Sequence, residues 1–144
     1  MMTIGSDIRR GAVAVSALFI ACCAWAQTIG EVRRELARQR VPHAEIVLAQ
    51  ARLESGNFTS HRARKHHNIL GIKHNGRYAR YKRWQDCVAD YKRHISSRYR
   101  RGENYYAFLR RVGYAEDKKY ERKVRKIVRT SKNKKHEGKT QNNG

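Results

Sequence analysis

With 144 residues, one proline and a hydrophobic fraction of 40%, the chain has room for one compact domain and little else. Its 33 basic and 12 acidic residues give a net charge of +21, which predicts a polyanionic partner: an acidic envelope polymer, anionic lipid, or nucleic acid bound without sequence preference. The alternative is that the charge only keeps the domain soluble, but so large an excess costs self-repulsion that solubility does not require.

Residues 1–26 are typical of a secretory signal peptide. Arg9 and Arg10 precede an apolar run over residues 11–23, and Ala24-Trp25-Ala26 supplies the small-x-small pattern that signal peptidase accepts. The run is shorter than the roughly 20 residues that cross a bilayer as a helix, so an uncleaved anchor is the weaker alternative. We therefore expect an exported protein that acts in the periplasm, in the cell envelope or outside the cell.

Cleavage before Gln27 would leave 31 basic and 11 acidic residues, a net charge of +20. It would also remove Cys22 and Cys23, so that Cys87 stays as a single cysteine and no internal disulfide forms. Lipidation at Cys22 is a third alternative, although the residues before it lack the leucine of a lipobox. We expect a monomer without stable membrane insertion after cleavage.

Apolar residues at helical spacing predict five helices in the remaining chain. They cover residues 28–40, 42–55, 84–99, 105–112 and 120–128. The second is apolar on most of its circumference, so we expect it at the centre of the domain. Pro42 suits the first position of this helix, and Gly56 supplies a left-handed stop after it.

A small β-hairpin is expected between the second and third helices. Asn75-Gly76 is the dipeptide best suited to a type I′ turn, and the runs 69–74 and 77–81 flank it. Residues 57–67 are polar and basic, which predicts a loop or a short irregular helix. The expected fold class is therefore mainly α with a small hairpin lobe.

The last residues have the composition of a disordered tail. Residues 131–144 contain many lysines and no apolar side chain, so burial cannot offset their ordering entropy. We therefore expect a signal peptide over residues 1–26, one domain over 27–130 and a disordered basic tail over 131–144.

Glu54 is the first candidate for chemistry, because it lies at the C-terminal end of the most apolar helix. The helix dipole and a poorly hydrated environment both disfavour a carboxylate there, so both raise its pKa. A carboxylic acid that stays protonated near neutral pH can protonate the leaving oxygen when a glycosidic bond breaks. The alternative is a glutamate that points into solvent.

Four blocks in order resemble the glucosaminidase domains of glycoside hydrolase family 73, over Val41–Val128: VPHAEIVLAQARLESGNFTS, HNILGIK, YARYKRWQDCVADY and YYAFLRRVGYAEDKKYERKVRKIV. The resemblance implies a lysozyme-like fold and a peptidoglycan hydrolase that cuts the β-1,4 bond after N-acetylglucosamine. In the family, the glutamate of the AQxxLESG block is the general acid, which assigns this role to Glu54. No cofactor is expected.

The resemblance also suggests residues of the substrate groove. Tyr114 matches a family tyrosine that lies in the groove and supports catalysis, although it could be one more core aromatic. Asn68 and Gly71 match the NLFGIK-type block, so Asn68 is a candidate for sugar contact, and a role in shaping the backbone is an equal alternative.

One family feature is missing from this sequence. Many members carry a second glutamate in the hairpin region, yet no acidic residue lies between Glu54 and Asp86. Asp86 and Asp90 fit better as charges favoured near a helix N-terminus. A single carboxylate could suffice if the substrate's 2-acetamido group assists, or in a lytic transglycosylase-like route.

Other reactive side chains are interpreted as structural. His61, His66, His67 and His74 cluster in the sequence, but their spacing matches no standard zinc pattern, so we expect solvated loop histidines and no metal. Cys87 shares an apolar stripe with its helical neighbours and is expected to be a buried small side chain.

The competing hypothesis is a binding module without catalysis. The same fold and basic tail could hold wall polymer or nucleic acid, with Tyr78, Tyr81 and Tyr99 among arginines available for base stacking. Export and the intact LESG block favour the hydrolase.

Overall fold

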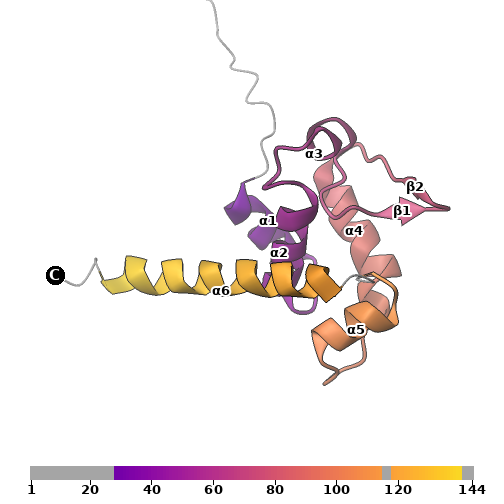
Figure 1. The fold of residues 1–144 in the computed structure, drawn as a ribbon. Coiled ribbons are helices and arrows are strands. Elements are labelled where there is room, and N and C mark those ends of the chain that lie inside the picture. Colours follow the sequence, from indigo (N-terminus) through magenta and orange to yellow (C-terminus); the bar gives the residue numbers. More distant parts are fainter. Residues whose placement is uncertain (1–27, 115–117, 141–144) are drawn as a thin grey trace, which may run out of the picture.

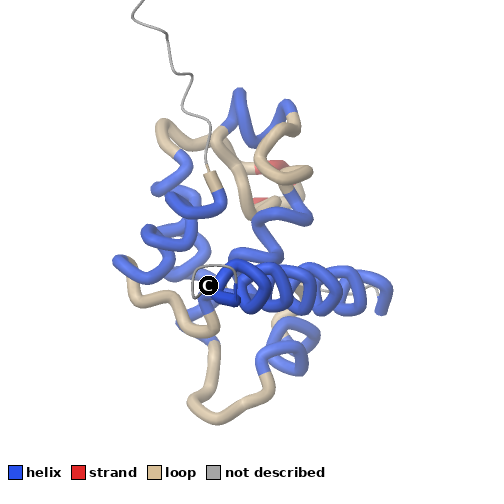
Figure 2. The backbone as a smooth tube through the Cα atoms, turned by 90° about the vertical axis from the view of Figure 1, so that its left-hand side faces the viewer, coloured by secondary structure: helices blue, strands red, loops and turns tan. Residues whose placement is uncertain are grey.

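The computed structural model describes residues 28–114 and 118–140. Helices make up most of it, and one short hairpin projects to one side in Figure 1; Figure 2 shows the same backbone turned by 90°. In chain order the elements are α1 (Ile29–Arg38), α2 (Ala44–Glu54), α3 (His61–His66), β1 (Lys73–His74), β2 (Arg77–Tyr78), α4 (Trp84–His94), the 3-10 helix η1 (Ser96–Arg98), α5 (Tyr105–Arg111) and α6 (Lys118–Thr140). This confirms the mainly helical, lysozyme-like class with a hairpin lobe. The expected signal peptide, Cys22 and residues 141–144 lie outside the described residues.

Helix α2 is the centre of the core, as its composition predicts. Five consecutive residues of this helix are buried, Val47 to Ala51, so it is covered on all sides. Helices α1 and α6, far apart in the sequence, both pack against it. The residue that ends α2, Glu54, is therefore held by the most enclosed element of the molecule.

The ends of the first two helices follow local sequence signals with one exception. Thr28 and Glu31 form a reciprocal capping box at the start of α1, with the Thr28 amide 2.8 Å from Glu31 Oε2. Gly56 has φ of +56°, which confirms the left-handed stop after α2. Pro42 is not the first residue of α2, however, because His43 takes a left-handed conformation and the helix starts at Ala44.

The hairpin has the predicted turn but shorter strands. Asn75 and Gly76 have φ of +51° and +77°, as a type I′ turn requires, and Lys73 pairs with Tyr78. Each strand has only two residues. Beyond them, the carbonyl oxygen of Ala79 accepts a hydrogen bond from the Asn68 side chain at 3.0 Å rather than from another strand.

Helix α4 ends at His94 rather than Tyr99, and η1 follows it. Its two aspartates have different roles. Asp86 pairs with Arg83 in the first turn at 2.9 Å, as expected near a helix N-terminus. The same interpretation is wrong for Asp90, which is buried in the middle of the helix beside the hairpin.

Asp90 fastens the hairpin to α4. Its carboxylate accepts a hydrogen bond from the Tyr81 hydroxyl at 2.6 Å and lies 2.7 Å from His74 Nε2 and 2.5 Å from His94 Nδ1. Burial by itself raises the pKa of Asp90, but these three hydrogen bonds outweigh it and lower the pKa below 3.8. The anchor depends on an ionised aspartate.

Helix α6 continues to Thr140, whereas the composition predicted disorder from residue 131. Its N-terminal half packs through Val124 and its neighbours, so the costly first turns of the helix form against the core. Propagation then needs no burial, because lysine is a good helix former, and residues 132–135 are helical while exposed. In Figure 1 this C-terminal part extends past α1 and α2. Within the described residues, no helix combines the length and the apolar character needed to cross a membrane.

Candidate active site

Glu54 lies where two cavities meet. One cavity has a volume of about 420 Å³ and the other about 480 Å³, and Glu54 and Tyr78 line both. The first is otherwise lined by residues at α3 and by one residue after the hairpin: Ser60, His61, Arg62, His66 and Arg80. The second lies between the hairpin and the end of α5 and is otherwise lined by Gly71, Ile72, Lys73, Ile95, Val112, Gly113 and Tyr114. Glu54 thus borders open space on two sides.

The surroundings of Glu54 favour its protonated form. Burial raises its pKa above the ordinary 4.5. Hydrogen bonding from the Tyr120 hydroxyl and the positive charges of Arg62 and Lys73 act in the opposite direction without cancelling the effect. The pKa is therefore shifted in the direction predicted from the sequence, and burial is the main cause.

The carboxyl of Glu54 rests against the backbone of Gly71. A Cβ atom at Gly71 would lie 2.5 Å from Glu54 Oε2, and Gly71 also has φ of +64°. Only glycine leaves room for the carboxyl here without backbone strain. The sequence motif marks Gly71, but nothing local in the sequence shows that its missing side chain makes space for the acid.

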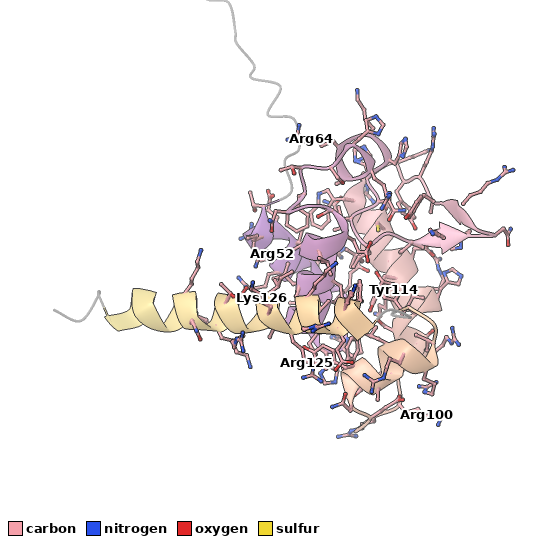
Figure 3. All side chains as sticks on the ribbon, viewed as in Figure 1. Arg52, Arg64, Arg100, Tyr114, Arg125 and Lys126 are labelled. Carbon is pink, nitrogen blue, oxygen red and sulfur yellow. The ribbon has the colours of Figure 1, made fainter. Side chains whose placement is uncertain are left out.

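Asn68 and Tyr114, the two other candidate site residues, have different surroundings. Asn68 is fully buried, lines neither cavity, and donates to the Ile72 carbonyl at 2.8 Å while accepting from the Ile72 amide at 2.9 Å. These contacts support the backbone-shaping alternative over sugar contact. Tyr114, labelled in Figure 3, lines the second cavity with Glu54, and its hydroxyl donates to the carbonyl of Leu70.

Sequence reasoning missed the cations beside the acid. The Arg62 guanidinium lies 3.5 Å from the centre of the Tyr78 ring, and Lys73 Nζ lies 4.7 Å from it. Tyr78 is 43% exposed, so it presents an aromatic edge between the two cavities. Among the residues that line these two cavities, Glu54 is the single carboxylic acid.

Of the remaining candidates, His61 and His66 line the first cavity with Glu54, whereas His74 and Cys87 line neither cavity. His61 and His66 stack edge to face at 5.4 Å, and His74 binds Asp90. No three potential metal ligands gather anywhere in residues 28–114 and 118–140. Cys87 is buried, as predicted, and burial raises the pKa of its thiol to about 12.

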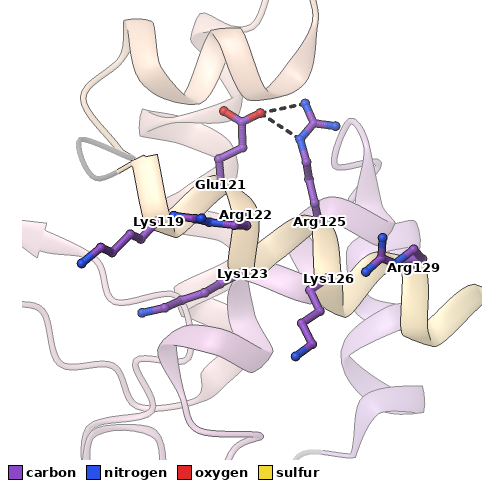
Figure 4. Close-up of a pocket in the computed structure, with 7 residues that line it drawn as sticks. All are labelled: Lys119, Glu121, Arg122, Lys123, Arg125, Lys126 and Arg129. Atoms are coloured by element: carbon purple, nitrogen blue, oxygen red, sulfur yellow. Dashed lines mark hydrogen bonds and ion pairs between the residues drawn. The ribbon is translucent and has the colours of Figure 1, made fainter.

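The basic surface of α6 consists of Lys119, Arg122, Lys123, Arg125, Lys126 and Arg129 (Figure 4). Glu121 lies among them and binds Arg110 of α5 and Arg125. A hollow of about 870 Å³ runs between these side chains, but all its walls come from one helix. It is therefore a charged surface rather than a cleft that could enclose a substrate.

The family model described as mannosyl-glycoprotein endo-beta-N-acetylglucosaminidase matches residues 30–133. The match includes Glu54, Gly71, Tyr114 and α6 as far as Asn133. Neither the curated proteins nor the solved structures contain a match to this chain.

Proposed function

Because the chain belongs to the glucosaminidase family, a family of glycoside hydrolases with peptidoglycan-type substrates, we propose that it cuts the β-1,4 bond after N-acetylglucosamine with Glu54 as general acid. The observation that carries the proposal is the position of Glu54 at the junction of two cavities, where burial raises its pKa. A protonated carboxyl there can donate to the leaving sugar oxygen.

The proposed route uses one carboxylate. With no other acid among the cavity-lining residues, the 2-acetamido oxygen of the substrate attacks its own anomeric carbon while Glu54 protonates the leaving oxygen. Glu54, now ionised, then takes a proton from the water that opens the cyclic intermediate. The competing one-carboxylate route is lytic and cuts the other bond, the one after N-acetylmuramic acid. Glu54 protonates the leaving oxygen, and the C6 hydroxyl of the muramic acid then attacks its own anomeric carbon in place of water and gives its proton to Glu54, which leaves a 1,6-anhydro end.

The decisive experiment compares wild type with Glu54→Gln on isolated peptidoglycan, with released reducing ends as the readout. Glu54→Gln should lose activity by at least about a hundredfold, as expected for a missing general acid. Glu45→Gln is the matched control, because Glu45 lies on the same helix but is exposed and paired with Arg33 at 2.9 Å. Mass spectrometry of the fragments identifies the bond: reducing N-acetylglucosamine ends support hydrolysis, and anhydro-muramic ends support the lytic route.

A binding module without catalysis is the second candidate, favoured by the lone carboxyl and the basic surface of α6. It predicts that wild type and Glu54→Gln bind walls equally and that neither releases sugar. That result would contradict the hydrolase.

We further propose that the protein is exported by the leader over residues 1–26 and acts as a monomer on the wall, where its positive charge attracts anionic envelope polymers. N-terminal sequencing of protein recovered outside the cytoplasm should begin at Gln27. A start at Cys22 would instead indicate lipidation.

A further inference from the structure

A chain of polar side chains runs from the core to Glu54. Gln50 lies one turn before Glu54 on α2, so both side chains share a face of the helix. Tyr120, in the first turn of α6, meets this face: its hydroxyl lies 3.3 Å from Gln50 Nε2 and acts on the Glu54 carboxyl, whose pKa it lowers. On its other side Gln50 Oε1 lies 3.1 Å from the Tyr91 hydroxyl, which lies 2.9 Å from that of Tyr105.

The chemistry of these groups determines the direction of every bond. The Gln50 carbonyl oxygen can only accept, so the single hydroxyl proton of Tyr91 goes to it, and Tyr105 must donate to Tyr91. The Gln50 amide nitrogen can only donate, so the oxygen of Tyr120 accepts from it. The proton of Tyr120 is then free to point at Glu54.

Tyr114 is the other acceptor within reach of that proton. Its own hydroxyl proton is taken by the Leu70 carbonyl, so Tyr114 can offer Tyr120 only a phenol oxygen. Whenever Glu54 is ionised, its carboxylate is the stronger acceptor, because hydrogen bonds to ionised groups are about twice as strong as neutral ones. This series of hydrogen bonds, from Tyr105 to Tyr120, therefore ends in a donor directed at Glu54.

Burying these polar side chains costs free energy of desolvation, so we ask what the hydrogen bonds of Gln50 achieve. Gln50 and Tyr91 are fully buried, and Gln50 lies in an otherwise apolar stretch of α2. A buried amide contributes little net stability even when both of its ends are bonded, and an apolar side chain of similar size would fill the site as well. The residue that uses Gln50 is Tyr120. Without the hydrogen bond from the Gln50 amide, the hydroxyl of Tyr120 could rotate freely.

We propose that Tyr120 is a positioning residue for the reaction, held in one orientation by Gln50 and Tyr91, and that it aims the Glu54 carboxyl at the junction of the two cavities. This inference rests on the proposed function of Glu54 as the acid. It assigns α6 to the active site, because the helix that carries the basic surface also supplies the hydroxyl that orients the catalytic side chain.

A Tyr120 hydroxyl that donates to Glu54 changes the pKa of the carboxyl, whereas a tyrosine that only fills space would not. The groups that face Glu54 are Arg62 of α3, Lys73 of β1, Tyr120 of α6 and Tyr114. Of these, Tyr120 donates a hydrogen bond that favours the ionised form of Glu54 and so opposes the effect of burial. Removing its hydroxyl should therefore raise the pKa of Glu54 further and leave the carboxyl less firmly oriented.

The test uses Tyr120→Phe in the full chain, with Tyr106→Phe as the matched control. Tyr106 is also buried against α6, but its ring stacks under Arg125, 3.7 Å away, and it belongs to no chain toward Glu54. The first readout is the carbon-13 NMR titration of the Glu54 side-chain carboxyl, assigned with Glu54→Gln. The second is the pH dependence of kcat and KM on peptidoglycan fragments.

We expect Tyr120→Phe to raise the titration midpoint of Glu54, to move the alkaline limb of kcat/KM to higher pH, and to lower kcat about tenfold with KM unchanged. Gln50→Leu should shift both properties the same way by less, and Tyr106→Phe should shift neither. An unchanged midpoint in Tyr120→Phe, or an equal change in Tyr106→Phe, would overturn the proposal. If wild type is inactive, the proposed function fails, whereas the titration still tests the contact between Tyr120 and Glu54.

Discussion

The position of the Glu54 carboxyl, the proposed general acid, depends partly on the absence of a side chain at Gly71. Gly71→Ala would place a Cβ 2.5 Å from Glu54 Oε2, so the carboxyl must turn away from the junction of the cavities. We expect kcat on peptidoglycan to fall at least about tenfold, since misplacing an acid by about 1 Å is costly. Gly102→Ala is the control: its φ of +84° imposes similar strain, of roughly 1 kcal/mol, with nothing within 4 Å. Equal activity of the two variants would contradict the role of Gly71.

The same carboxyl should cost the protein stability at neutral pH. The folded-state pKa of Glu54 is raised above 4.5, so the folded chain holds this proton more tightly than the unfolded chain does. Its contribution to stability is fully present below pH 4.5 and is lost as the pH rises through the folded pKa. Glu54→Gln should therefore be more stable than wild type in urea unfolding at pH 7, with the gain vanishing near pH 4.

The exposed Glu45→Gln should show no such gain, because its carboxylate is solvated in both states. A Glu54→Gln variant that is less stable than wild type at pH 7 would show that the acid does not have a strained environment. Stability given up at a reacting group is a common feature of active sites.

At the scale of elements, one buried carboxylate, that of Asp90, holds the hairpin against α4. Asp90→Asn keeps the shape but weakens the hydrogen bonds to Tyr81, His74 and His94, so we expect a loss of about 1–3 kcal/mol in unfolding free energy at pH 7. The pKa of Asp90 is lowered, so its contribution is present above pH 3.8 and is lost as the pH falls through the folded pKa. Urea unfolding at pH 7 and near pH 3 measures the difference in stability between wild type and Asp90→Asn. This difference should shrink at the lower pH.

Asp86→Asn is the control for this element. Asp86 lies on the same helix, but it forms an exposed pair with Arg83, which is worth about 0.5 kcal/mol or less. Similar losses in both variants would mean that the hairpin is not held through Asp90. Since Lys73 and Tyr78 lie on this hairpin, Asp90→Asn should also lower activity more than Asp86→Asn does.

Over the whole molecule, one helix, α6, carries much of the positive charge and also Tyr120, the proposed positioning residue. Helix α6 carries eleven lysines and arginines against two glutamates, and Lys132, Lys134 and Lys135 are exposed on the part beyond the core. Changing these three to Gln should weaken pelleting with isolated cell walls and flatten its salt dependence, because fewer counterions are released on binding. Turnover of short soluble glycan fragments should stay unchanged.

The control for the effect of net charge removes three positive charges outside α6. It combines Arg40→Gln, Lys92→Gln and Arg101→Gln. All three residues are exposed and lie outside α6. If both triple variants lose wall binding equally, net charge rather than α6 mediates attachment.

Local patterns in the sequence determined much of this protein. Helix periodicity placed α2 at the centre, Asn75-Gly76 defined the hairpin turn, and the LESG block singled out Glu54 at a helix end. The helix and the turn depend on neighbours within a few positions, where spacing alone decides which face a side chain occupies. The choice of Glu54 depended on a resemblance carried by four blocks between Val41 and Val128. Over residues 131–140 the structure has a helix where the composition predicts disorder, because helix propagation from a packed start does not require burial.

Only the tertiary structure decided how the acid is surrounded. The close approach of Gly71, the hydroxyl of Tyr120 and the cations of Arg62 and Lys73 reach Glu54 from separate elements. Asp90 likewise acts through partners on the hairpin that sequence spacing assigns to other roles. Such contacts join residues that are distant in the chain, and they depend on how the helices pack together, which no local pattern specifies.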